Sequence, residues 1–209
     1  ISAMHGVEQN NPHHVYDVFN HTMVAVENAP NNEILRWVML LHDVGKVATK
    51  FTDKRGIDHF YNHQDESVKI SEEILKRLKF SNQEKKQILE MVKLHDRQIQ
   101  PSPKAIRRLL NQLRYINLED LVLVKKSDAK AQNPDFLDKK LKSLDKIKAL
   151  AKEEEKITVN DLAVDGYDLM GAGLRGREIG IMQRELLNLV LDNPNINNKK
   201  TLIQYIKNE

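Results

Sequence analysis

The residues of this chain that could do chemistry are histidines and aspartates on the inward faces of helical segments. In a helix, residues three, four and seven apart share a face, and His21 shares its face with Val18 and Val24. Four further segments place metal-capable side chains in the same way, and these are His42 with Asp43, His63, His95 and Asp128. One such residue is usually a satisfied core histidine, but five segments together favour a common metal site. Imidazole and carboxylate ligands suit Mn, Fe, Co, Ni, Zn or Mg, and such an ion can supply hydroxide near neutral pH.

The strongest local signal is the segment 35–46, LRWVMLLHDVGK. Five apolar residues in a row predict a helix that is buried nearly all round, with His42 and Asp43 at its end. A buried carboxylate is costly unless it is paired or binds a metal, so Asp43 either meets an arginine, caps a helix or holds an ion. Gly45 is expected to end this helix in the left-handed conformation.

Two residues before His21 lie on its predicted helical face. His14 and Asp17 precede His21 by two turns and one turn. They are therefore candidates for partners that fix the tautomer of the His21 imidazole.

The rest of the chain must position these groups, and its hydrophobic period predicts an all-α fold. Helices are expected near 13–28, 32–44, 64–79, 82–95, 103–114, 117–131, 135–155, 177–192 and 199–207. Residues 47–62 are the exception and predict a small β-hairpin that turns at Lys54-Arg55-Gly56. Asn133-Pro134 is the best candidate boundary, which gives a main domain over 1–134 and a helical tail over 135–209.

Composition limits the class of protein. With 40% apolar and 30% charged residues, the 209-residue chain can build a core. No apolar run approaches the roughly 18 residues of a membrane-spanning helix, and no signal peptide is visible, so we expect no membrane partner. The absence of cysteine excludes disulfides and thiolate ligands and agrees with a cytoplasmic protein. The net charge of +3 does not by itself predict nucleic-acid binding.

Four arginines could still contact RNA phosphates. Arg107 and Arg108 share one helix, whose basic face either is simply solvated or contacts phosphate. Arg175 and Arg177 stand in the glycine-bearing stretch 166–180, where backbone amides at a helix start could hold an RNA phosphate. The alternative for that stretch is a tight turn with close helix packing.

Over residues 13–131 the chain resembles the HD superfamily of metal-dependent phosphohydrolases. The shared residues, in order, are His21-Thr22, His42-Asp43-Val44-Gly45-Lys46, His63, His95-Asp96 and Asp128. This resemblance implies a helical bundle whose metal is bound by His21, His42, Asp43 and Asp128. It also implies that His63 and His95 bind a second metal or contact phosphate. Lys46 would lie near the substrate phosphate, and Arg97 is a weaker candidate for the same role.

Further segments resemble the C-terminal half of bacterial CCA-adding tRNA nucleotidyltransferases. They are the stretch from Gly6 to Thr22, His59-Phe-Tyr-Asn-His63, Ser127 to Gln132, Asp165 to Met170, and Glu178-Ile-Gly180. No Gly-Ser turn followed by an Asp-x-Asp pair precedes them, and the chain begins at Ile1 as an excised fragment would. Nucleotide addition by this chain alone is therefore not expected.

The sequence thus predicts a metal-dependent phosphohydrolase in which Asp43, Lys46, His63 and His95 serve catalysis. The expected substrate is a phosphomonoester or a 2′,3′-cyclic phosphodiester of a nucleotide or an RNA end, with tRNA as a partner. Two other functions stay open. One is a catalytically silent scaffold that binds tRNA, and the other is a free-standing nucleotide phosphohydrolase.

Overall fold

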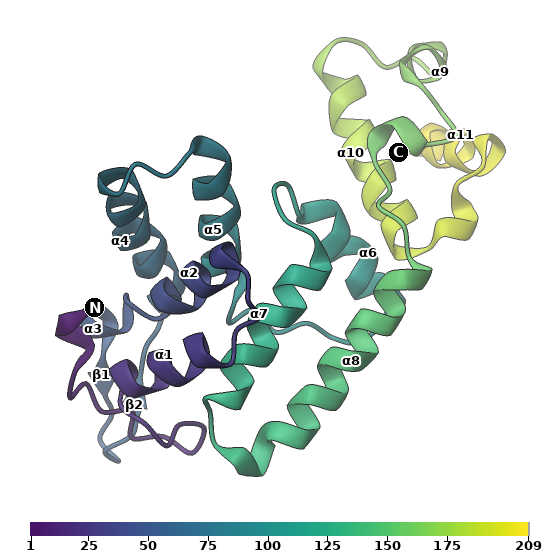
Figure 1. The fold of residues 1–209 in the computed structure, drawn as a ribbon. Coiled ribbons are helices and arrows are strands. Elements are labelled where there is room, and N and C mark those ends of the chain that lie inside the picture. Colours follow the sequence, from purple (N-terminus) through teal and green to yellow (C-terminus); the bar gives the residue numbers. More distant parts are fainter. Residues whose placement is uncertain (209) are drawn as a thin grey trace. The chain divides into compact units, whose positions relative to one another are not determined.

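The structure is a computed structural model, and it describes residues 1–208. Helices dominate, which confirms the predicted all-α class (Figure 1). The elements are α1 (Val18–Glu27), α2 (Glu33–Leu41), α3 (Lys46–Thr49), β1 (Phe51–Thr52), β2 (Asp58–His59), α4 (His63–Arg77), α5 (Asn82–Leu94), α6 (Pro103–Gln112), α7 (Leu118–Lys130), α8 (Leu137–Glu153), α9 (Gly166–Gly171), α10 (Arg177–Asp192) and α11 (Lys199–Asn208). None of the described helices is both long and apolar enough to span a membrane.

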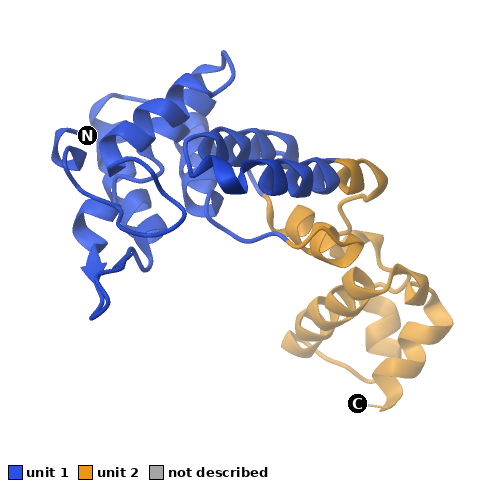
Figure 2. Ribbon diagram, turned by 90° about the horizontal axis from the view of Figure 1, so that it is seen from below, with its two compact units in different colours: residues 1–99, 114–148 blue, residues 100–113, 149–209 orange. Residues whose placement is uncertain are grey.

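The chain forms two compact units, coloured separately in Figure 2. The first unit contains residues 1–99 and 114–148, and the second contains 100–113 and 149–209. This division differs from the predicted boundary after residue 134. The first part of α8 belongs with α7 because Lys126 pairs with Asp145 at 2.5 Å and Lys148 pairs with Glu119 at 2.5 Å.

The core of the first unit surrounds α2, which packs against α1, α5 and α7. Val38, Met39 and Leu41 are fully buried, as the apolar run of this segment predicts. Burying an aliphatic side chain of this size contributes roughly 1.5–3 kcal/mol relative to leaving it exposed. The helix that carries His42 and Asp43 at its end is therefore among the most firmly held elements of the unit.

Polar caps define where several helices start. Asn32 caps α2, and Ser81 forms a capping box with Glu84 at the start of α5. The helix predicted from residue 13 instead begins at Val18. Asp17 lies in extended backbone and accepts a hydrogen bond from the amide of Asn20, so it caps α1 rather than belonging to it.

Gly45 has a different role from the one expected. Its backbone is right-handed (φ −73°, ψ −18°), so the prediction of a left-handed helix end is wrong. A Cβ at this position would lie 2.3 Å from the His63 carbonyl oxygen and 2.5 Å from the Ser67 amide nitrogen. Glycine is therefore required because α4 approaches the end of α2 closely, and this approach brings His63 towards His42 and Asp43.

The small hairpin lies where the sequence predicts it. Strands β1 and β2 are antiparallel and pair Phe51 with His59 and Thr52 with Asp58. The Asp53 carboxylate accepts hydrogen bonds from the amides of Arg55 and Ile57 and thereby holds the turn. Strand β2 ends at His59, and the short connection 60–62 leads into α4.

The second unit has its own core, formed mainly by α9, α10 and α11. Its fully buried side chains include Leu169, Leu186 and Val190. Helix α9 was not among the predicted helices, because Gly166 and Gly171 lower its helix propensity. Asp165 nevertheless starts it with a capping box.

Arg107 is an internal residue of the second unit. It is 8% exposed, it pairs with Glu154 at 2.9 Å, and its Nε donates to the Leu191 carbonyl at 2.8 Å. The proposal that it contacts RNA phosphate is therefore corrected, since its guanidinium is committed to the interior. The same contacts explain why α6 belongs to the second unit.

Candidate metal centre

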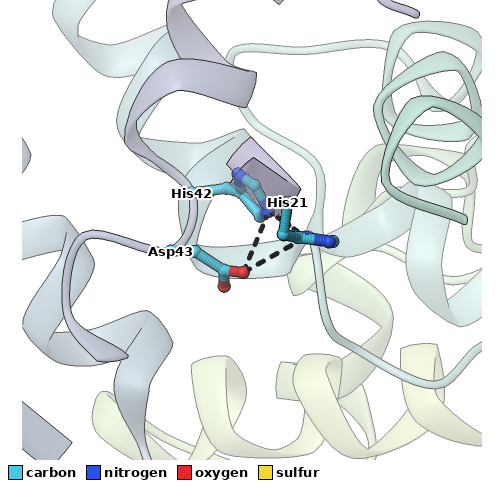
Figure 3. A group of neighbouring side chains, drawn as sticks. All are labelled: His21, His42 and Asp43. Carbon is cyan, nitrogen blue, oxygen red and sulfur yellow. Dashed lines mark hydrogen bonds and ion pairs between the residues drawn. The ribbon is translucent and has the colours of Figure 1, made fainter. Parts of the chain in front are cut away.

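Six side chains from five segments of the first unit come together at one place, the metal centre. They are His21 from α1, His42 and Asp43 after α2, His63 at the start of α4, His95 after α5, and Asp128 on α7. Five of them are at most 6% exposed, and the Asp128 side chain is 14% exposed. Figure 3 shows three of them, with dashed lines joining both imidazoles to Asp43.

The first group consists of His21, His42, Asp43 and Asp128. The Nε2 atoms of His21 and His42 lie 3.3 and 3.2 Å from Asp43 Oδ2 and 3.0 and 3.7 Å from Asp128 Oδ1. The two Nε2 atoms are themselves 3.2 Å apart. Ligand atoms bound at about 2.1 Å around one ion stand about 3.0–3.4 Å apart, depending on the coordination geometry. The two Nε2 atoms and Asp43 Oδ2 have about this spacing and fit a shared ion, while Asp128 Oδ1 has it to His21 but lies slightly too far from His42.

The second group uses the other oxygen of the same aspartate. Asp43 Oδ1 lies 3.4 Å from His63 Nε2 and 3.5 Å from His95 Nε2. The two Nε2 atoms are 3.2 Å apart. Asp43 thus faces one pair of imidazoles with each carboxylate oxygen, in the manner of a carboxylate that bridges two ions.

The tautomer of every imidazole in the metal centre is fixed by a backbone carbonyl. The Nδ1 atoms of His42, His63 and His95 lie 2.6–2.8 Å from the carbonyl oxygens of the residues three positions earlier. The Nδ1 atom of His21 lies 3.0 Å from the Ala131 carbonyl. A carbonyl can only accept, so each Nδ1 carries the hydrogen, and the neutral ring presents a bare lone pair at Nε2. Two facing lone pairs at 3.2 Å repel each other unless a cation lies between them, which fits a divalent metal.

The electrostatics of the first group also call for positive charge. Burial alone would lower the pKa of His42, but the neighbouring Asp43 and Asp128 carboxylates outweigh this effect and raise it to about 10. The same burial would raise the pKa of Asp43, yet His42 and Lys46 hold it well below its usual range. Without an ion, a proton would have to supply the charge that a metal supplies.

The comparisons with known proteins agree with this geometry. A family model described as the HD domain matches residues 13–161. The chain belongs to the HD domain family. It is 33% identical over 132 residues to the A-adding tRNA nucleotidyltransferase of Deinococcus radiodurans, a match that covers 60% of this chain and 30% of that protein. It is 29% identical over 124 residues to the Multifunctional CCA protein of Actinobacillus pleuropneumoniae, covering 54% of this chain and 29% of that protein. The chain thus matches less than a third of the length of these relatives, and no solved structure matches significantly.

The HD domain encloses a cavity of about 600 Å³ beside the metal centre. Asp43, His63, His95 and Asp128 line it together with residues 57–62 of the hairpin and of the connection to α4. Lys46 also lines this cavity. Its Nζ lies 2.7 Å from Asp43 Oδ2 and 2.7 Å from Gln9 Oε1.

Arg97 is placed differently. It is exposed and lines a smaller cavity of about 150 Å³, which shares His95 and Asp128 with the larger one. Lys125 also lines the smaller cavity and donates to the carbonyls of His95 and Arg97, at 2.5 and 2.7 Å. Its observed role is to hold the backbone just after a metal-centre residue.

His14 lies beside the metal centre, but not because it shares a helical face with His21, as the sequence predicts. No helix contains it, yet its ring stands edge-on to His21 with centroids 5.1 Å apart, and it lines the large cavity. Its Nδ1 is buried and has no hydrogen-bond partner among the described residues. Burial and the nearby Lys46 ammonium lower its pKa to about 3. Asp17, by contrast, does not fix the His21 tautomer, because Ala131 does so.

The remaining predicted arginines lie in the second unit. The Arg108 Nε is 2.6 Å from Asp192, and Arg175 donates to the carbonyls of Met170 and Leu174. Arg177 is exposed at the start of α10. The structure therefore does not gather these three side chains into the metal centre.

Proposed function

We propose that this HD domain is a metal-dependent phosphohydrolase acting on a phosphomonoester or a 2′,3′-cyclic phosphodiester. One observation carries the proposal: Asp43 presents each of its oxygens to a different pair of imidazole lone pairs. Such an arrangement suits two divalent ions that share a carboxylate, and paired ions of this kind are used to displace groups at phosphorus. Hydrolysis would add water to phosphorus and break one phosphorus–oxygen bond.

The residues that would hold the ions follow from the two groups. His21, His42, Asp43 and Asp128 would hold one ion, and His63 and His95 would hold a second together with Asp43. Imidazole and carboxylate donors suit Mn, Fe, Co, Ni, Zn or Mg. A bound divalent ion would supply the charge that polarises a phosphoryl oxygen and makes water a stronger nucleophile.

Lys46 and His14 would act on the substrate from the cavity wall. The Lys46 ammonium is fixed between Asp43 and Gln9, where it would offset charge on the phosphate. With its pKa lowered to about 3, His14 is neutral at pH 7. A neutral ring can accept a hydrogen bond at one nitrogen and donate from the other, so we assign His14 to the positioning of water or a substrate hydroxyl.

The names of the relatives suggest where the phosphate comes from. Proteins named A-adding tRNA nucleotidyltransferase and Multifunctional CCA protein act on tRNA by those names, so we propose a nucleotide or RNA-end phosphate as substrate and tRNA as a partner. In the second unit, Arg177 and Arg175 are the proposed phosphate contacts, and Arg108 would contribute only if it left Asp192. A soluble cytoplasmic location is proposed with this function.

The test is hydrolysis of 2′,3′-cyclic AMP by metal-stripped protein that is resupplied with each of the six ions in turn. We expect turnover with at least one ion and its loss in Asp43→Ala. Asp65→Ala is the matched control, because Asp65 is exposed, pairs with Lys93 on the surface and does not line the cavity. If folded protein shows no turnover of 2′,3′-cyclic AMP with any ion, hydrolysis of cyclic phosphodiesters is refuted. Binding to tRNA that weakens steeply with salt would then favour a scaffold role.

A further inference from the structure

Aromatic rings form one wall of the large cavity, and this aromatic wall consists of His59 and Tyr61. Their rings are nearly parallel, at 6°, with centroids 5.3 Å apart. Phe51 continues the row on the neighbouring strand, with its centroid 6.3 Å from that of His59. Tyr61 is 67% exposed and Phe51 is 58% exposed. Both His59 and Tyr61 line the cavity that contains the metal centre.

Hydrogen bonds hold the aromatic wall in place. His59 Nε2 lies 3.2 Å from the Asp53 carboxylate, which can only accept, so this nitrogen carries the hydrogen in the neutral ring. His59 Nδ1 is then free to accept from the Tyr61 hydroxyl at 3.4 Å. Since Asp53 also fixes the hairpin turn, both rings are oriented before any ligand arrives. Ordered aromatic rings lose little conformational freedom when a flat ligand stacks on them.

The backbone links this wall directly to the metal centre. Asn62 separates Tyr61 from His63 and adopts the left-handed conformation, with φ 57° and ψ 22°. This is an uncommon conformation for a residue other than glycine, and such residues occur often at functional sites. It leaves the Tyr61 ring in solvent while His63, buried to 6% exposure, starts α4 within the metal centre. Two residues of chain separate their Cα atoms by at most about 7 Å, and both side chains line the same cavity, so one ligand in that cavity could contact both.

We propose that the outer face of Tyr61 is a subsite for the nucleobase of the substrate. The base would stack on Tyr61 while the phosphate of the same nucleotide lies at the metal centre. This inference rests on the proposed phosphohydrolase function and assigns the side chain that would recognise the base of its nucleotide substrate. The base belongs either to a free nucleotide or to the terminal nucleotide of an RNA.

The kinetic test compares a substrate with a base to one without. Wild type, Tyr61→Ala, Tyr61→Phe and Tyr115→Ala are assayed on 2′-AMP and on glycerol 2-phosphate with the ion that works best. Stacking of one base on an aromatic side chain corresponds to a change of about 5- to 150-fold in affinity. We expect Tyr61→Ala to lower kcat/KM by this factor for 2′-AMP alone, chiefly through KM, and Tyr61→Phe to keep the wild-type value. Tyr115 is an exposed tyrosine of the same unit that does not line the cavity, so Tyr115→Ala should have no effect.

A binding measurement separates failure of the subsite from failure of the proposed function. Saturation-transfer NMR with the full chain is run on adenosine and on ribose, neither of which carries a phosphate to hydrolyse. Contact of the adenine protons with wild type and Tyr61→Phe, but not with Tyr61→Ala, supports the subsite even if no ion gives turnover. Equal adenosine signals in Tyr61→Ala and wild type would overturn it, as would equal losses of kcat/KM on both substrates.

Phe51→Ala distinguishes the two sources of the base. If the substrate is an RNA end, a second base can stack further along the row, and Phe51→Ala should weaken a dinucleotide that ends in a 2′-phosphate but leave 2′-AMP unchanged. If Phe51→Ala affects neither substrate while Tyr61→Ala affects both, the subsite takes the base of a single nucleotide.

Discussion

Gln132 provides the sharpest test of how the metal centre is organised. Its Nε2 donates to Asp128 Oδ2 at 2.8 Å, which leaves Asp128 Oδ1 facing His21 and His42. Lys140 on α8 donates to the Gln132 Oε1. Because an ammonium can only donate and a carboxylate can only accept, the two contacts leave the amide one orientation. Gln132 is therefore expected to position Asp128 as a ligand without touching the ion itself.

Gln132→Leu removes this donor while keeping a side chain of similar size. Loss of a hydrogen bond to a metal ligand typically weakens metal binding by about 10- to 100-fold, which corresponds to about 1.4–2.7 kcal/mol. The Asp128 oxygen would also be left partly buried without its donor, and this favours the upper half of that range. Lys140→Met should weaken metal binding less, since the Gln132 amide can still donate to Asp128 without its contact to Lys140.

The assay is titration of metal-stripped protein with Mn²⁺, following the free ion by electron paramagnetic resonance. Gln64→Leu is the matched control, because Gln64 lines the same cavity and its side chain forms no hydrogen bond to the metal centre among the described residues. Circular dichroism checks that every variant is folded. If Gln132→Leu binds Mn²⁺ as tightly as wild type and the control, Asp128 does not depend on this hydrogen bond, and the reasoning fails.

Three further predictions concern the framework. Gly45→Ala should destabilise the protein by at least about 2 kcal/mol in urea unfolding and weaken metal binding, because its Cβ would collide with the backbone of α4. Gly171→Ala is the control, since a Cβ there has no atom within 4 Å, and it should change neither the stability nor the metal affinity. Arg107→Met should lower the unfolding free energy of the second unit by about 3–5 kcal/mol, because it leaves the partly buried Glu154 carboxylate without its partner. Arg108→Met at the exposed neighbouring position should lower it by under about 1 kcal/mol. Equal losses would contradict the interior role of Arg107. Burial lowers the pKa of Lys125 to about 8 from its usual value of 10.5, so between these pH values the unfolded chain binds more protons and stability should rise with pH. The rise should approach 1.4 kcal/mol per pH unit at most, and Lys125→Met should abolish it in chemical unfolding measured from pH 8 to 10.5.

Much of the fold could be predicted because the sequence carries a clear helical period. The predicted segments contain α2, α5, α7 and α10 within a few residues of their observed bounds. Two of the failures share a physical origin, namely contacts between distant parts of the chain. Nothing local shows that Gly45 lies against α4, and nothing local shows that Arg107 is buried beside Glu154. Both depend on packing that a periodic pattern cannot specify.

The metal-centre residues could be found from the sequence for a reason that the structure makes explicit. His42 and His95 each occupy the position directly after a helix, where the last carbonyls of the helix lack intrahelical partners. Each ring donates from Nδ1 to one of these carbonyls, at 2.6 and 2.7 Å, and so turns Nε2 outward by a purely local bond. Where a histidine directly follows a helix, the local backbone alone can therefore orient its imidazole as a metal ligand.

His21 shows the limit of this local logic. Its Nδ1 donates to Ala131, 110 residues away at the end of α7, three residues after Asp128. The orientation of this one ring is therefore set only when α1 packs against α7, which also brings Asp128 within 3.0 Å. One contact thus assembles two of the four proposed ligands of the first ion at once. For this reason the histidine pattern could indicate a metal site, while the pairing of His21 with Asp128 at a single oxygen required the folded chain.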